Sequence, residues 1–102
     1  MQEFIAAQRN EIAELCRRHR VRRLAVFGSA ARDDFDPASS DIDLIVEFDE
    51  MPIEQYADNK WALEEELASR FSRRIDLLTW SSIQNPYFLN IVQQSYQPVY
   101  GD

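Results

Sequence analysis

The sequence is poor in the residues on which several kinds of site depend. Its 102 residues include one cysteine, one histidine and two glycines. Cys16 has no second cysteine for an intrachain disulfide, and one Cys with one His does not make a Cys/His zinc site. No apolar run approaches the roughly 18 residues of a membrane span, and nothing resembles a signal peptide. We therefore expect a protein of the reducing cytoplasm.

Positive charge is also scarce. The chain has 11 Lys and Arg against 18 Asp and Glu, which gives a formal net charge of −7 and disfavours a generic nucleic-acid-binding protein. The charge is uneven, because residues 1–32 hold seven Arg and three Glu, whereas residues 33–102 hold four basic and fifteen acidic residues. Two interpretations of the basic part remain open: a solvated helix surface, or attraction of an anionic triphosphate or acidic partner.

Length and composition fit one small domain that spans residues 1–102. Hydrophobic periodicity predicts a helix over 3–19 and two more that begin near residues 52 and 85. In the last of these we expect Tyr87, Ile91 and Val92 to pack inward. Strands are predicted over 21–27, 41–48 and 74–79, with a short edge strand over 96–100. The fold class is α+β: a small mixed β-sheet with helices packed mainly on one face, and an open face that carries the acids.

A small-residue turn, Gly28-Ser29, follows the apolar run 24–27. Glycine lets other groups approach the backbone closely, and Ser29 is a candidate N-cap of a short helix over 29–32. The unpaired amides at a helix start favour an anion such as a phosphate. Taken alone, however, a Gly-Ser pair is often an ordinary turn.

Two carboxylates follow on the next strand. Alternate residues of a strand point to opposite faces, so Asp41 and Asp43 point the same way, with Cα atoms roughly 6–7 Å apart. Like charges this close repel each other unless a positive charge compensates. Divalent cations held by carboxylates and substrate phosphates supply that charge. The alternative is that this face of the strand is simply exposed to solvent.

A third acid, Asp76, lies between apolar residues of the strand over 74–79. If that strand neighbours the strand of Asp43, three carboxylates converge on one face. Asp76 would then hold a metal ion or accept a proton from an attacking hydroxyl. The competing interpretation is a salt bridge from Asp76 to Arg73 or Arg74.

The segment FGSAARDDFDPASSDIDLIVEF, residues 27–48, closely resembles the minimal nucleotidyltransferases of the DNA polymerase β-like superfamily. Their signature is Gly-Ser, a spacer and Asp-x-Asp. The resemblance implies Gly28 and Ser29 at the triphosphate of ATP. It implies Asp41, Asp43 and Asp76 as catalytic carboxylates and ligands of two Mg²⁺ ions.

Two further residues are candidates for the nucleotide site. Arg32 is a possible phosphate contact, although a salt bridge with Asp33 or Asp36 competes with that role. Ser40 is expected to cap or orient the loop that enters the strand. The sequence departs from many relatives in its spacer of eleven residues, where ten is common, and in having Asp33 where many have Gly. Both departures concern the shape of the loop.

The resemblance also implies a function. Many small prokaryotic members are antitoxins paired with a HEPN-domain toxin, so we expect AMP transfer from ATP to a tyrosine hydroxyl of such a toxin, within a hetero-oligomer. Three alternatives remain: an antitoxin that neutralises by contact alone, nucleotidyl transfer to a small molecule, and extension of a nucleic-acid 3′ end. The net charge of −7 counts against the last.

Overall fold

The computed structural model describes residues 1–32, 36 and 41–101 of the chain. Its strands are β1 (Val21–Phe27), β2 (Ile42–Phe48), β3 (Ile75–Thr79) and β4 (Gln97–Tyr100). Its helices are α1 (Glu3–Ala6), α2 (Arg9–Arg18), α3 (Ile53–Phe71) and α4 (Pro86–Ser95), with two single turns of 3-10 helix, η1 (Gly28–Ala31) and η2 (Trp80–Ser82). No helix in this described part of the chain has both the length and the apolar character needed to cross a membrane.

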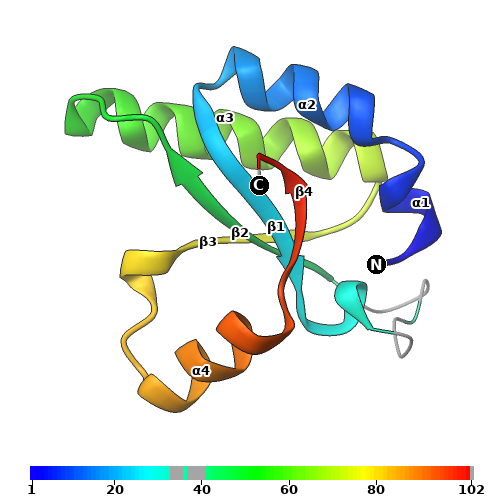
Figure 1. Ribbon diagram of the computed structural model, residues 1–102. Helices are drawn as coiled ribbons and strands as arrows, with labels where there is room; N and C mark the ends of the chain where they lie inside the picture. The colour runs from blue at the N-terminus through cyan, green and yellow to red at the C-terminus, as the bar shows by residue number, and fades with distance from the viewer. Residues whose placement is uncertain (33–35, 37–40, 102) are drawn as a thin grey trace.

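The four strands form one mixed sheet in the order β3-β2-β1-β4 (Figure 1). Strand β1 pairs antiparallel with β2 and with β4, whereas β2 and β3 run parallel and are joined through α3. The small mixed sheet predicted from the sequence is confirmed. Pro98 lies in the edge strand β4, where its missing amide costs no central ladder bond.

The main core lies between one face of the sheet and helices α1, α2 and α3. The even-numbered residues of β2 from Ile42 to Val46 are buried there, together with Leu63 and Leu67 of α3. In Figure 1, α2 and α3 lie at the top, while α4 lies apart from them at the bottom. Helices therefore pack mainly on one face, as the two-residue period of strand β2 predicted.

The opposite face is less open than the sequence suggested. A second, smaller cluster forms there around Ala25, Phe27 and Ile45, which α4 covers with Val92. The prediction of a wholly open acidic face is therefore wrong for the middle of the sheet. The cause is α4, which Asn85 caps: the side-chain oxygen of Asn85 accepts hydrogen bonds from the amides of Tyr87 and Phe88 in the first turn.

The expected packing of α4 is also wrong in two places. Val92 is buried as predicted, but Tyr87 is 81% exposed and Ile91 is 57% exposed. Helical spacing identified an apolar stripe correctly, yet the described chain offers no surface against which that stripe packs. These side chains return below.

The predicted helix over 3–19 is broken at residues 7–8 into α1 and α2. Its residues are ordinary helix formers, so local preference does not mark the break. Tertiary hydrogen bonds explain it: the amide of Gln2 donates to the carbonyl of Ala30, and the Gln2 side chain donates to the carbonyl of Arg32. These bonds hold the start of α1 against η1.

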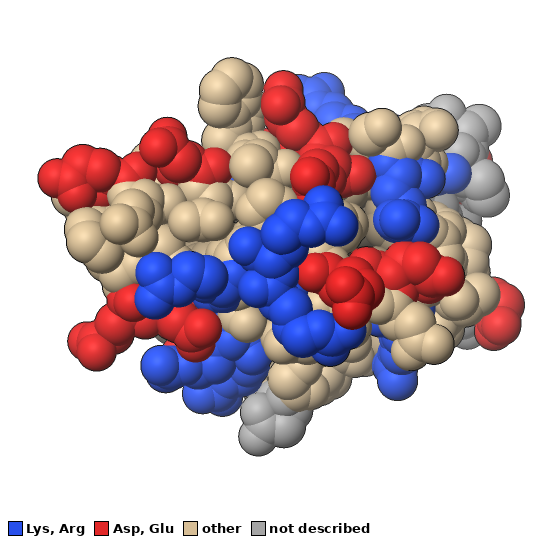
Figure 2. Space-filling view, turned by 90° about the horizontal axis from the view of Figure 1, so that it is seen from above, with Lys and Arg blue, Asp and Glu red and all other residues tan. Residues whose placement is uncertain are grey.

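Two arginines of the basic N-terminal part lie far in space from the Gly28-Ser29 turn. Arg22 and Arg23, at the start of β1, pair with Glu47 at 3.4 and 3.2 Å. Gly28 lies at the other end of that strand, roughly 20 Å away. Figure 2, which views the molecule from the top of Figure 1, shows basic side chains in a band with acidic ones on both sides. The interpretation as a solvated, ion-paired surface is therefore favoured.

Cys16 gives a prediction about reactivity. The residue is fully buried in α2, and burial raises the pKa of its thiol to about 12. At pH 8 the thiolate fraction is then about 10⁻⁴, against about 0.2 for a free cysteine. We expect iodoacetamide to alkylate the native protein at least about a hundredfold more slowly than the same protein in denaturant, as measured by mass spectrometry. Rapid labelling of the native form would contradict this burial.

Candidate active site

The site is built on the neighbouring strands β1, β2 and β3, of which β3 is an edge strand. Asp43 of β2 pairs with Asp76 of β3 in the parallel ladder, and with Phe27 of β1 on its other side. Paired residues of adjacent strands point to the same face, so Asp43 and Asp76 share one face. Asp76 is exposed and, among the described residues, has no ion pair. The competing interpretation, a salt bridge from Asp76 to Arg73 or Arg74, is not found there.

Asp41 lies one residue before β2 and is partly exposed. Its carboxylate Oδ2 is 4.0 Å from Nε of Arg74, whose side chain is 83% exposed. An ion pair this long and this exposed contributes little to stability, so it does not tie Asp41 down. The arginine that competes for an acid of this group thus pairs with Asp41 rather than with Asp76.

Gly28 brings the chain backbone directly against Asp43. The residue has φ +65°, and a Cβ atom at this position would lie 2.5 Å from Oδ2 of Asp43. Only glycine combines this left-handed conformation with this close approach. The Gly-Ser turn and the carboxylates therefore meet in space, which sequence spacing alone does not establish.

The electrostatics of the site show that negative charge outweighs positive charge around Asp43. Burial, with a smaller contribution from the like charges of Asp76 and Asp41, raises the pKa of Asp43 to about 6, although Arg32 acts to lower it. Both other acids, Asp41 and Asp76, are thus close enough to influence Asp43. A carboxylate held near two others in a half-buried position is the kind of site that a cation stabilises.

Ser29, Arg32 and Ser40 are the remaining candidates for the nucleotide site. Ser29 lies within the single 3-10 turn η1, whose N-cap is Phe27, so the predicted capping role of Ser29 is wrong. Arg32 follows this turn, and its side chain is exposed and near enough to affect Asp43. Ser40 lies outside the described residues, as does Asp33. Because η1 has only four residues, its anion-binding capacity rests on local amides rather than on a helix dipole.

Sequence reasoning missed the residues that brace this turn. Besides the two bonds from Gln2, the N-terminal ammonium of Met1 donates to the carbonyl of Ala31 at 3.4 Å. Phe27 contacts Phe88 of α4 edge to face, with ring centroids 5.9 Å apart. A polar residue at the start of a helix gives no sequence signal for such a distant role.

The donor set fits hard divalent cations. Among the described residues, no three His, Cys, Asp or Glu side chains are gathered closely enough to hold a metal ion unaided. Magnesium does not require such a cage, because it is usually held by one or two carboxylates together with substrate phosphates and water. Carboxylates on one strand face beside a glycine turn satisfy that requirement.

The sequence profile described as a nucleotidyltransferase domain matches residues 9–99. The chain belongs to the nucleotidyltransferase domain family. A relative from Methanocaldococcus jannaschii, MJ1379, which is named as a protein adenylyltransferase, is 34% identical over 93 residues, covering 83% of this chain and 91% of the relative. This nucleotidyltransferase is therefore an enzyme of the class that the Gly-Ser and Asp-x-Asp pattern predicted.

Solved structures share its fold. A structure described as a minimal nucleotidyltransferase has a TM-score of 0.69 at 31% identity and covers 94% of this nucleotidyltransferase and 93% of its own chain. A toxin–antitoxin crystal structure with AMP-PNP has a TM-score of 0.66 at 23% identity, covering 92% of this chain and 73% of that one. The complex of a tri-AMPylated Shewanella oneidensis HEPN toxin with an MNT antitoxin gives 0.64 at 22%, covering 96% and 73%. These last two likenesses concern the fold alone.

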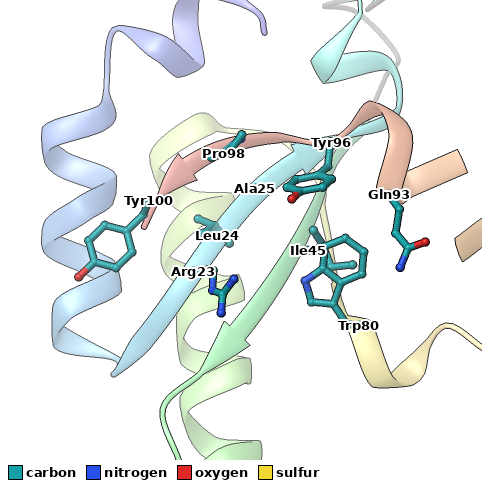
Figure 3. A pocket seen from close by; sticks show the side chains of 9 residues that line it. All are labelled: Arg23, Leu24, Ala25, Ile45, Trp80, Gln93, Tyr96, Pro98 and Tyr100. Atoms are coloured by element: carbon teal, nitrogen blue, oxygen red, sulfur yellow. The ribbon is translucent and has the colours of Figure 1, made fainter. Parts of the chain in front are cut away.

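A pocket of about 320 Å³ lies on the same sheet face of the nucleotidyltransferase, beyond Ile45 (Figure 3). Its lining contains none of the three acids. Ile45 is the next residue after Asp43 on that face, so the pocket adjoins the carboxylates without including them. Trp80 and Tyr96 form one wall, with ring centroids 5.4 Å apart.

Proposed function

We propose that this nucleotidyltransferase transfers AMP from ATP to a tyrosine hydroxyl of a HEPN-family toxin, in a Mg²⁺-dependent reaction in the cytoplasm, and thereby acts as an antitoxin within a complex of the two proteins. The observation that carries the proposal is the register of Asp43 with Asp76, together with the approach of Gly28 to Asp43. This arrangement supports a single site to which a triphosphate, metal ions and a hydroxyl have access.

Each residue has a stated role in the proposal. Asp41 and Asp43 hold Mg²⁺, with Asp76 as a further ligand, and the turn at Gly28-Ser29 anchors the triphosphate. Bound Mg²⁺ would neutralise charge on the phosphates and the leaving group. The tyrosine oxygen forms a bond to the α-phosphorus, the bond to pyrophosphate breaks, and Asp76 takes the hydroxyl proton. Arg32 and Ser40 are assigned to the nucleotide.

Names of similar proteins support the choice of nucleotide and acceptor. The relative from M. jannaschii is named as a protein adenylyltransferase, and one structural neighbour contains AMP-PNP. Another contains an AMPylated HEPN toxin. Within this chain, the three acids lie outside the lining of the nearby pocket. That arrangement suits an acceptor that brings its own surface to complete the site.

The proposal is tested by comparing the wild type with Asp76→Asn, using labelled ATP and a HEPN-domain toxin as the acceptor. We expect kcat to fall about 10²–10⁴-fold because the acceptor proton loses its base. The nucleotide-dependent rise in melting temperature should persist, since Asp43 and Gly28 remain. Glu47→Gln is the matched control, because Glu47 lies on the same face of β2 but pairs with Arg22 and Arg23. Undiminished transfer by Asp76→Asn would contradict the assigned role.

Neutralisation of the toxin separates catalysis from contact. The double variant Asp41→Ala/Asp43→Ala, expressed at the same level as the wild type, should fail to restore growth of cells that carry the HEPN protein. Growth restored equally by both forms, without consumption of ATP, would instead establish an antitoxin that acts by binding.

A further inference from the structure

A long run of the sequence near its C-terminal end, residues 77–101, has no charged residue. Residues 77–101, a run of 25, contain no Asp, Glu, Lys or Arg, although such residues make up 28% of the whole chain. The run includes the whole of α4. A helix at the surface of a soluble domain ordinarily carries charged side chains on its solvent face. The absence of charged side chains from α4 therefore requires an explanation.

Burial within the chain is not that explanation, because α4 is mostly exposed. Val92 is the only fully buried residue among its ten. Tyr87 and Ile91, one helical turn apart, are 81% and 57% exposed, and Phe88 is 37% exposed. Tyr96, just past the helix, is 39% exposed. Depletion of charge with enrichment of aromatic residues is the composition of the centre of a protein–protein interface.

The position of this surface connects it to the catalytic face. Phe88 packs edge to face on Phe27, which precedes Gly28 and pairs with Asp43 in the sheet. At the other end of α4, Gln93 and Tyr96 line the pocket drawn in Figure 3. A protein seated on α4 therefore lies beside the carboxylates at one end and over the pocket at the other.

We propose that α4, through Tyr87, Phe88, Ile91 and Tyr96, is the docking surface for the protein that accepts AMP. Its occupant presents an apolar, uncharged surface, and one of its side chains enters the pocket next to Trp80. This inference rests on the proposed function, because it identifies where the acceptor of that reaction binds. Nucleic acid does not suit the surface, since residues 77–101 offer no Lys or Arg to phosphates.

Charge substitution on α4 tests the surface directly. Complex formation with a HEPN-domain toxin is measured without ATP by titration calorimetry, for the wild type, Ile91→Glu and Tyr87→Glu. Both substitutions should weaken binding at least about tenfold, because each places a charge in an apolar contact. Ile53→Glu is the matched control: Ile53 is 79% exposed at the start of α3, outside this surface. Its binding should equal that of the wild type.

Each outcome decides the proposal. Wild-type affinity in both Ile91→Glu and Tyr87→Glu overturns it, as does failure of the wild type to bind the HEPN protein. A dimer of the free chain that Ile91→Glu dissociates also overturns it, because the surface then joins two copies. Unchanged circular dichroism and melting temperature establish that the variants fold. Binding that depends on Ile91 without any AMP transfer confirms the docking surface and refutes the proposed function separately.

Discussion

Asp43→Asn is expected to abolish AMP transfer and, at the same time, to make the metal-free protein more stable. The substitution removes a proposed metal ligand, so we expect activity to fall by at least about a thousandfold. It also removes a negative charge that lies half-buried beside Asp41 and Asp76. After allowance for solvent screening, relief of that charge should contribute about 1 kcal/mol, or about 4–8 °C in melting temperature.

The pH dependence has a definite sign. The pKa of Asp43 rises from 3.8 to about 6 on folding, so the folded protein binds the proton more tightly than the unfolded chain does. The stability of the metal-free wild type therefore decreases as pH rises through this interval, and the full penalty is present above it. The difference in melting temperature between Asp43→Asn and wild type, measured in EDTA, should be largest at pH 7 and vanish near pH 4.

Two comparisons make this prediction specific. Asp49→Asn serves as the control, because Asp49 is exposed and pairs with Arg22 at 3.5 Å, so its removal should give no stabilisation. Mg²⁺ with ATP should raise the melting temperature of the wild type and leave that of Asp43→Asn unchanged. A variant at Asp43 that is less stable than the wild type in EDTA would refute the electrostatic account.

Gly28→Ala is expected to impair both folding and transfer. Alanine in the left-handed conformation costs about 1–3 kcal/mol, and its Cβ would displace the Asp43 carboxylate that lies 2.5 Å away. Misplacement of a catalytic group by about 1 Å lowers kcat about a hundredfold. The measurement is kcat per folded molecule at a temperature where circular dichroism shows the variant to be native.

The second glycine of the chain is a natural control. Gly101 has φ +77°, and a Cβ there would lie 2.6 Å from the carbonyl oxygen of Arg22, far from the acids. Gly101→Ala should lose a similar amount of stability yet keep the kcat of the wild type. Equal kcat values for both variants would show that the contact between Gly28 and Asp43 has no catalytic importance.

The local sequence pattern predicted the strands well. It did not predict the register between them. The two-residue period of β2 correctly placed Ile42 and Asp43 on opposite faces. Nothing in that period states which residue of β3 lies beside Asp43, because register depends on how two distant segments pair. The position of Asp76 between apolar residues of a predicted strand made it a candidate, the family resemblance assigned it a role, and the sheet shows that it pairs with Asp43.

Other features of the structure depend on tertiary contacts that no local window contains. The break after α1 follows from hydrogen bonds between Gln2 and η1, whose carbonyls are about 30 residues away in sequence. Helical spacing found the apolar stripe with Tyr87 and Ile91, but a stripe does not state what covers it. In each case the local preference was consistent with the structure and insufficient to specify it.

Asp43 lies on an inner strand, and this location makes its position in the enzyme less tolerant of substitution than the surface of α4. Strand β2 has hydrogen-bonded neighbours on both sides, so its backbone opens only when the whole sheet does. Helix α4 is attached largely through Val92. If α4 docks the acceptor as proposed, substitutions on it would alter which protein is recognised at small cost to the scaffold, whereas the chemical step would stay with Asp43 and Asp76. New specificities are therefore accessible to this fold without rebuilding its catalytic groups.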